Sequence, residues 1–293
     1  PRSTLFPYTT LFRSGPQGTV EVTVTQNYAF WDQSVGQDVY LPYHFIPGDR
    51  LAAASRRRDG REHPLAVTPN ATIAKELLVM ALRDRDLYLA GIAMHSFADT
   101  WAHQNFCGII DDYNNAAEGT GLPPAGHLQV LTSPDDPAGR WHDGRLVPEY
   151  GDIDNRERFA EAAGKLYRYL CVYRGKSFAD EQLVIDKLRA LWARQNRDER
   201  LADYVIGWDI APWEAGAWRR EAGAPVETSA LSRVRHYDKL AWAGSVIAGD
   251  MKRPRVVQVD SSVYSSHLYR WNEAALEHRR RAASLMAGAG LPC

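Results

Sequence analysis

Apolar side chains recur along most of the chain with the spacing of α-helices rather than of strands. Helical spacing begins near Asn70, where Ile73 and Leu77 start an apolar face, and it stops at a break or exposed turn over 84–86. A second helix is predicted over 87–106. Further helices are expected over 155–174, 178–195, 199–208, 213–221, 230–246 and 261–286. The pattern therefore predicts an all-α fold, a single domain of several helices.

Other parts of the chain depart from helical spacing. Val20, Val22 and Val24 alternate with polar residues, which predicts a short extended segment near the N-terminus. A polar segment over 49–64 contains three consecutive arginines, and we expect it to be a solvated loop. Residues 107–152 are rich in glycine, proline, aspartate and asparagine. They predict a long loop that is either structured for a function or floppy.

Composition narrows the class of protein. Of 293 residues, 45% are hydrophobic and 24% are charged, which is typical of a globular protein, and the net charge is only −1. This balance, without aromatic residues interleaved among basic ones, gives no nucleic-acid signature. No apolar run is long enough to form a transmembrane segment. The three cysteines are scattered and form no C-x-x-C pair, so any metal would have to be held by His, Asp and Glu.

The first residues have an unusual origin. Residues 4–14, TLFPYTTLFRS, resemble, residue for residue, the translation of a common DNA-sequencing adapter. We therefore expect residues 1–14 to be an artefact and residues 15–293 to form a domain that lacks its natural N-terminus. The compartment stays open for this reason, with a cytoplasmic location favoured and secretion as the alternative.

The predicted helix 87–106 carries the candidate chemistry. Apart from Tyr88, its ionisable side chains are His95, Asp99 and His103, in apolar surroundings that indicate a buried helix. A buried carboxylate needs a charged or hydrogen-bonded partner. The four-residue spacing puts all three side chains on one stripe, with the histidines about 12 Å apart along the axis. The arrangement suits two metal ions better than one, and imidazole with carboxylate fits zinc or another divalent ion.

The sequence also supports a second interpretation and offers further candidate ligands. The same three residues could instead form a buried hydrogen-bond network without a metal. His44 precedes a Pro-Gly turn, and an extended segment could deliver it to a site. His127 lies within the long loop and is a further candidate. Motifs for a nucleophile elbow, a P-loop or a dinucleotide site are missing from the sequence.

The helix motif resembles that of a known superfamily. The segment from His95 to His103, HSFADTWAH, is similar to the H-x-x-x-D-x-x-x-H helix of zinc-dependent phospholipase C and fungal single-strand nucleases, and more closely to the fungal heterokaryon-incompatibility C protein. The chain also resembles uncharacterised bacterial proteins that share V-Y-x-P-x-H-F-x-P-G at 39–48 and A-x-H-x-x-A-D-T-W-x-H-Q-N-F at 93–106. The resemblance implies an all-α phospholipase C/nuclease fold and up to three zinc ions that hydrolyse phosphodiesters.

The resemblance also assigns ligands by position. His95 and Asp99, joined by His44, would serve a first metal, and His103 and His127 would serve a second. The superfamily has a further acid four residues after the last histidine.

In this chain the position four residues after His127 is Leu131 instead of an acid. That ligand is therefore absent or comes from elsewhere, with Asp135 as the candidate. Asp135 or Asp136 would also orient a water molecule in catalysis.

Two main classes of function follow from these expectations, and an amidase or other metal hydrolase on the same scaffold is a third. One is a zinc-dependent hydrolase that acts on a small-molecule or lipid phosphoester through metal-activated water. The alternative is a non-catalytic helical protein with a structural metal or none, which acts through a partner. Coordination number separates them, because structural zinc sites have four protein ligands and catalytic ones keep an open position.

Overall fold

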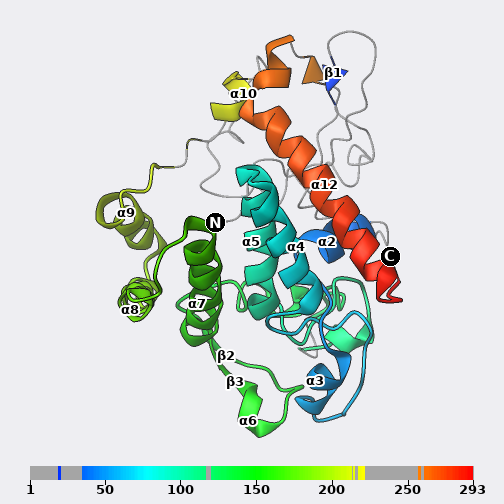
Figure 1. Cartoon of the computed structure of the whole chain (residues 1–293). Helices are drawn as coiled ribbons and strands as arrows, with labels where there is room; N and C mark the ends of the chain where they lie inside the picture. Colours follow the sequence, from blue (N-terminus) through cyan, green and yellow to red (C-terminus); the bar gives the residue numbers. More distant parts are fainter. Residues whose placement is uncertain are drawn as a thin grey trace.

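The part of the chain that the structure describes is mainly helical (Figure 1), as predicted. Helix α5 (Leu87–Ala102) is central and has neighbouring helices on two sides. On one side it packs against α4 (Thr72–Asp84) and α12 (His267–Gly288), and on the other against α7 (Asn155–Arg174). The computed structural model describes residues 19–20, 35–116, 120–212, 214, 217–221, 257–258 and 261–292.

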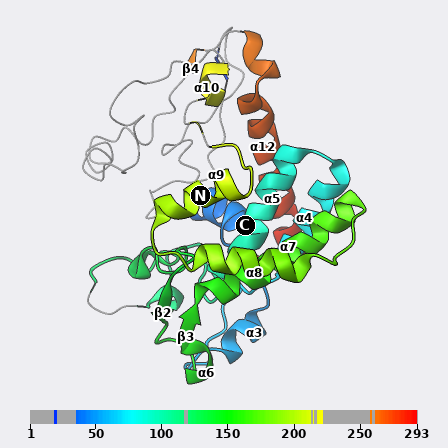
Figure 2. The ribbon, with the colours of Figure 1, turned by 90° about the vertical axis from the view of Figure 1, so that its left-hand side faces the viewer.

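Shorter elements surround these four helices (Figure 2). The short strands form two antiparallel pairs. β1 (Thr19–Val20) pairs with β4 (Val257–Gln258), and β2 (Arg140–His142) pairs with β3 (Asp152–Asp154). The other elements are η1 (Gly36–Tyr40), α2 (Leu41–Tyr43), α3 (Arg50–Ser55), η2 (Asp112–Asn114), η3 (Leu128–Val130), α6 (Pro148–Gly151), α8 (Glu181–Trp192), α9 (Arg197–Gly207), α10 (Ala217–Glu221) and η6 (Ser261–Ser265).

The turn between α4 and α5 follows from its sequence. Arg85 closes α4 in the left-handed conformation, with φ 58°, and the Asp86 side chain accepts hydrogen bonds from the first amides of α5. Helix α5 ends at Ala102, earlier than the predicted 106. Its last carbonyl oxygens accept hydrogen bonds from the Arg158 guanidinium of α7, which replaces the amides of a further turn. His103 therefore caps the helix instead of lying within it.

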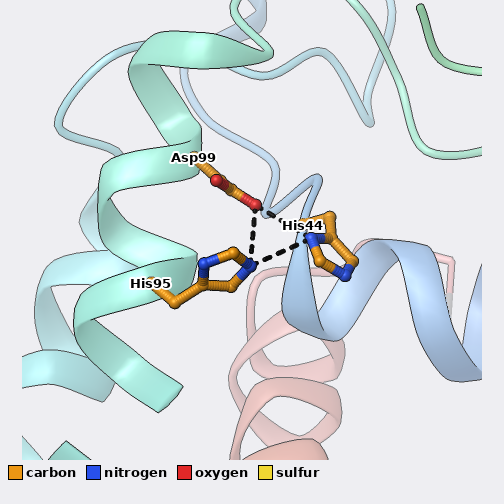
Figure 3. Close-up of side chains that lie close together, drawn as sticks. All are labelled: His44, His95 and Asp99. Atoms are coloured by element: carbon orange, nitrogen blue, oxygen red, sulfur yellow. Dashed lines mark hydrogen bonds and ion pairs between the residues drawn. The ribbon is translucent and has the colours of Figure 1, made fainter. Parts of the chain in front are cut away.

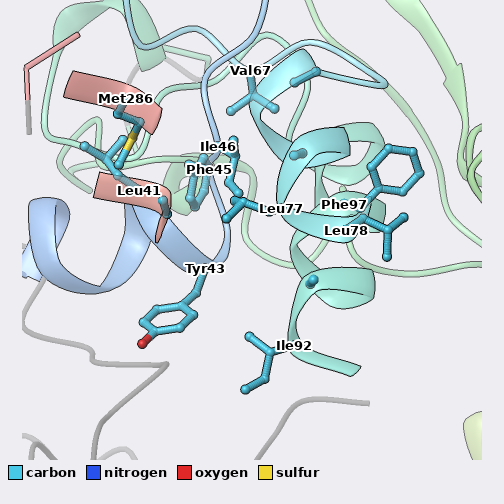
Figure 4. Packing of buried hydrophobic residues seen from close by; sticks show 14 of the residues in the cluster. Leu41, Tyr43, Phe45, Ile46, Val67, Leu77, Leu78, Ile92, Phe97 and Met286 are labelled. Carbon is cyan, nitrogen blue, oxygen red and sulfur yellow. The ribbon is translucent and has the colours of Figure 1, made fainter. Parts of the chain in front are cut away.

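The core joins segments that are distant in the sequence (Figure 4). Leu41 and Ile46 from the N-terminal segment, Leu77 from α4, Phe97 from α5 and Met286 from α12 are buried in one cluster. Burial of each such side chain contributes about 1.5–3 kcal/mol. The segment with Leu41 and Ile46 and the last helix are thereby fixed against α5, the helix with the candidate chemistry.

The segment before His44 is helical rather than extended. Residues 36–43 form η1 and α2, and the amides of His44 and Phe45 both donate to the carbonyl oxygen of Tyr40. When a short run is apolar at nearly every position, its periodicity does not show whether it forms a buried helix or a strand. The expectation of an extended segment at this point was therefore wrong.

The arginine-rich segment is largely exposed, as expected, but it is not a loop throughout. It begins with α3, and the Arg57 side chain is only 4% exposed. Its guanidinium forms an ion pair with Asp59 and lies over the ring of Tyr113. Sequence reasoning treated the arginines as equal, although the aromatic partner of Arg57 is 56 residues away and only the fold brings it near.

The long segment 107–152 is structured wherever it is described. It contains η2, η3, β2 and α6, and backbone hydrogen bonds connect its turns. Helix α7 has its predicted bounds, whereas α8 is shorter than expected. None of the described helices is both long and apolar enough to cross a membrane. The predictions for residues 1–14, for Val22 and Val24, and for 230–246 lie outside the described residues.

Candidate metal centre

The first cluster joins two side chains of α5 to one that follows α2 (Figure 3). His95 and Asp99 lie one turn apart on α5, and His44 follows the end of α2. Asp99 Oδ2 lies 2.9 Å from His44 Nδ1 and 3.3 Å from His95 Nε2, and the two nitrogens are 3.2 Å apart. Ligands of tetrahedral zinc, each about 2.0 Å from the ion, are about 3.3 Å from one another. The three atoms therefore match one face of a zinc coordination tetrahedron.

Helix α12 holds the segment that carries His44. The Tyr43 hydroxyl donates to the carbonyl oxygen of Ala275 at 2.7 Å. His278 Nε2 lies 2.9 Å from the carbonyl oxygen of Pro42, and its imidazole stacks on the Tyr43 ring. His278 is 1% exposed. These contacts fix the backbone on the N-terminal side of His44 against the last helix.

The second cluster is built from the end of α5 and two turns of the long segment. His103 caps α5, His127 precedes η3, and Asp135 lies in the turns that follow. Asp135 Oδ1 lies 3.3 Å from His103 Nε2, and its Oδ2 lies 3.7 Å from His127 Nε2. One carboxylate thus faces two imidazoles, and these three residues could hold a metal ion.

Backbone carbonyls determine which nitrogen of each histidine faces this second cluster. His103 Nδ1 lies 2.7 Å from the carbonyl oxygen of His44, and His127 Nδ1 lies 2.8 Å from that of Leu131. A carbonyl oxygen only accepts, so each Nδ1 carries a proton and each Nε2 is directed to Asp135. Metal-binding histidines in proteins commonly have their second nitrogen oriented in this way.

Close packing positions the two rings of the second cluster. The imidazole of His103 stacks on the Phe45 ring, with centroids 4.4 Å apart, and on His127 at 4.9 Å. Gly126, with φ 51°, brings the backbone against Phe45, and a Cβ at this position would lie 2.7 Å from the ring. Glycine is required before His127 because of both the positive φ and this approach.

The two clusters adjoin, and their charges are coupled. Asp99 Oδ2 lies 3.8 Å from His103 Nδ1. Burial opposes the ionised form of Asp99, but His95 and His103 outweigh it and hold the pKa of that carboxyl below its ordinary value. Burial also lowers the pKa of His103, yet the carboxylates of Asp99 and Asp135 outweigh it and raise that pKa to about 9. The protein without a metal therefore holds an ionised Asp99 beside imidazoles.

The structure brings together the five candidate metal ligands that the sequence suggested. They are divided as the resemblance implied, with His44, His95 and Asp99 in one cluster and His103 and His127 in the other. Asp135, expected in a catalytic role or as a replacement for the acid missing at Leu131, completes the second cluster.

Asp136 is not brought into either cluster. Its Oδ1 accepts from the amide of Ala138 and lies 3.5 Å from the Arg200 guanidinium.

Sequence reasoning missed the residues that support these clusters. His278 received no role, although the alanines at 274, 275 and 282 mark an apolar helix face around it. Asn155 and Arg158 also received none, and the sequence has no signal for them, because their partners are backbone carbonyls of distant segments.

Comparison with known proteins places the chain in a family. The model of a family of unknown function (DUF6765) matches residues 8–286, a range that includes every residue of both clusters. Neither the curated proteins nor the solved structures gave a match. Because the match spans nearly the whole chain, the protein belongs to this family of unknown function, DUF6765.

Proposed function

We propose that this protein is a metal-dependent hydrolase, with zinc as the metal and a phosphoester as the substrate. The observation that carries the proposal is the pair of adjoining clusters, each with two imidazoles and one carboxylate. Three protein ligands are typical of catalytic zinc sites, whereas structural sites have four. The proposal includes a phospholipase C/nuclease type of all-α fold, supported by the similarity of the segment from His95 to His103.

The donor atoms fit zinc better than most other ions. Neutral imidazole with carboxylate, without thiolate, suits a borderline divalent cation. Carboxylates alone would suit magnesium or calcium, but each cluster has two histidines for one acid. The hydrogen bonds from His103 and His127 to backbone carbonyls give both rings the tautomer that binds a metal through Nε2.

The residues of the two clusters have separable tasks in this function. A bound zinc ion lowers the pKa of water and neutralises charge on a phosphoryl oxygen. Asp99 lies between His95 of the first cluster and His103 of the second. Its negative charge would balance the charge of a metal ion at the first cluster. Asp135 has both oxygens directed to histidines of the second, and its half-exposed side chain can reach a water molecule as well.

Metal content and turnover test the proposal directly. Elemental analysis after mild purification is expected to find more than one zinc ion per chain. A chromogenic phosphodiester, bis(4-nitrophenyl) phosphate, should be hydrolysed, and a chelator should stop the reaction until zinc is restored. A chain that binds no zinc even after reconstitution overturns the proposal. Zinc binding without turnover of phosphodiesters and phosphomonoesters would favour the non-catalytic alternative.

Two neighbouring aspartates supply a matched pair of variants. Asp135→Asn removes a charge from the second cluster and is expected to lower turnover by about 100-fold or more, with loss of one zinc ion. Asp136→Asn changes the same side chain in the same turn, but its partners are Arg200 and a backbone amide. Turnover should stay within about threefold of the unaltered protein. Equal losses in both variants would contradict the assignment of Asp135.

A further inference from the structure

A buried asparagine at the start of α7 connects three parts of the molecule. Asn155 is fully buried, and its side-chain amide has a partner for each donor and acceptor. Nδ2 donates to the carbonyl oxygens of Ser133 and Asp136, at 2.6 and 2.7 Å. Oδ1 accepts from Trp141 Nε1 and from Arg158 Nη1, both at 3.2 Å. Such a residue specifies one arrangement of its neighbours, because any displacement leaves a buried polar group unpaired.

The two carbonyls that Asn155 holds lie on either side of Asp135. The amide of Asp135 donates to the carbonyl oxygen of Thr132, so the turn is closed from within as well. The backbone amide of Asn155 adds a third connection, to the carbonyl oxygen of Gly139. The position of the Asp135 carboxylate thus depends on the first residue of α7.

Arg158, one turn further along α7, holds the other half of the second cluster. Its guanidinium donates to the carbonyl oxygens of Trp101 and Ala102, the two residues that precede His103. These are carbonyls at the end of α5, where the helix itself offers no amide partner. The hydrogen bond between Arg158 and Asn155 connects this helix end to the turn of Asp135.

The side-chain hydrogen bonds described around the first cluster come from other elements than α7. His95 and Asp99 lie within α5, and the backbone before His44 is held by α12. We propose that Asn155 and Arg158 are positioning residues that set the distance between His103 and Asp135, and thereby determine metal affinity at the second cluster alone. The inference rests on the proposed function, in that it needs a metal ion at this cluster.

Cobalt provides a probe that reports on each cluster. The full chain, freed of metal, is titrated with Co²⁺, whose visible absorption depends on the ligands and geometry of each site. In Asn155→Asp, Oδ1 still accepts from Trp141 and Arg158, but both donors to the Ser133 and Asp136 carbonyls are lost. We expect Co²⁺ affinity at the second cluster to fall about 10- to 100-fold, and affinity at the first to stay within about twofold. The absorption spectrum of the second site should change as well.

Two further variants make the result decisive. Arg158→Lys keeps the charge but loses the two-pronged guanidinium, and we expect a loss of about 5- to 10-fold at the second cluster. This variant carries the test if Asn155→Asp does not fold. Ile185→Ala, in α8 where that helix packs on α7, lowers stability without touching either cluster and should leave both affinities unchanged.

The outcomes separate this inference from the function on which it rests. If the unaltered chain binds Co²⁺ at both clusters, and Asn155→Asp and Arg158→Lys weaken both equally or neither, the positioning role is overturned while the proposed function stands. If the unaltered chain binds no Co²⁺ and no Zn²⁺, the proposed function is overturned and this inference with it. Selective weakening of the second cluster supports both.

Discussion

The two clusters have the same ligand types but are built in different ways. The first takes its ligands from the middle of α5 and from a short helix end, and its donor atoms are separated by 2.9 to 3.3 Å. The second combines a helix end with two turns, and its donors are 3.3 and 3.7 Å apart. Regular structure and core packing fix most of the first, with two hydrogen bonds between α12 and the segment before His44. The second depends on individual hydrogen bonds to backbone carbonyls, so single substitutions should separate the two sites.

The largest effect is expected from Asp99→Asn. The neutral amide cannot balance the charge of an ion at the first cluster, so zinc affinity there should fall by at least about 100-fold and phosphodiester turnover by about 1000-fold. The metal-loaded protein should also melt at a lower temperature, because binding contributes to folding stability. Elemental analysis after dialysis, turnover and melting curves measure these changes.

The same variant shows whether the clusters are independent. The second cluster should keep its zinc ion in Asp99→Asn, since its ligands are on other residues. Asp152→Asn removes a carboxylate that, among the described residues, pairs with the exposed His142, and it is expected to change neither metal content nor turnover. Retention of both zinc ions in Asp99→Asn would show that the carboxylate is not a ligand.

The next effect is the pH dependence of folding stability that His278 causes. This residue of α12 contacts the Pro42 carbonyl, close to His44 of the first cluster. Burial lowers the pKa of this imidazole to about 4, although the Pro42 carbonyl opposes the shift. The unfolded chain binds the proton near pH 6.5, so the stabilising contribution is present above that pH and is lost as the pH falls from 6.5 to 4. The loss should reach about 3 kcal/mol in the metal-free protein.

A variant isolates this contribution from those of other groups. His278→Gln can still donate to the Pro42 carbonyl but does not titrate. Urea unfolding at several pH values should give a curve that is flatter than that of the unaltered protein by the stated amount. His142→Gln, at an exposed position, should leave the curve unchanged. Parallel curves for His278→Gln and the unaltered protein would contradict the assignment.

At the second cluster, we expect pH to act on zinc affinity through His103, whose pKa is raised whereas that of His278 is lowered. The raised pKa of His103, about 9, means that the imidazole is protonated at pH 7 without a metal. Its contribution to the stability of the metal-free protein is complete below pH 6.5 and is lost as the pH rises through 9. Zinc has to displace the Nε2 proton that faces Asp135, so affinity should rise about tenfold per pH unit from 7 to 9 and then level off.

This dependence can be measured in Asp99→Asn if zinc remains only at the second cluster. Competition with a chelator of known affinity at pH 7, 8 and 9 gives the slope. Removing Asp99 also removes one of the carboxylates that raise the pKa of His103, so the curve should level off at a lower pH than in the unaltered protein. A flat profile from pH 7 to 9 in both proteins would mean that no proton is displaced.

The difference between the clusters also explains what the sequence could predict. His95 and Asp99 were placed together correctly because helical periodicity converts a four-residue spacing into proximity. The bounds of α7 and the turn at Arg85 followed from local signals in the same way. The helical character of the fold is likewise a sum of local patterns.

What failed depends on contacts between distant segments. The end of α5 was set four residues too late, because Arg158 lies more than 50 positions away and terminates the helix through its carbonyls. The helical conformation before His44 was missed, since its apolar run is buried from every side. His44, His127 and Asp135 were suggested by a resemblance and by their loops, and no spacing rule could have assigned them to clusters.

The smallest effect is expected at Leu131, whose carbonyl accepts from His127 Nδ1. Its backbone has φ 52° and ψ −120°, a conformation that is strained for a side chain with a Cβ, and the leucine side chain is largely exposed. Leu131→Gly removes the strain, and the greater freedom of glycine in the unfolded chain offsets part of the gain. We expect a net stabilisation of about 0.5–1 kcal/mol with zinc affinity at the second cluster within about twofold.

The control uses the same substitution three residues earlier. Leu128 lies in η3 and, unlike Gly126 and Leu131, does not have a positive φ. Glycine at this position therefore relieves no strain, and Leu128→Gly should destabilise the protein by about 1 kcal/mol. Urea unfolding compares the two variants. If Leu131→Gly is instead destabilising and weakens zinc binding only at the second cluster, then the leucine conformation itself orients His127, and the second cluster relies on backbone strain as well as on hydrogen bonds.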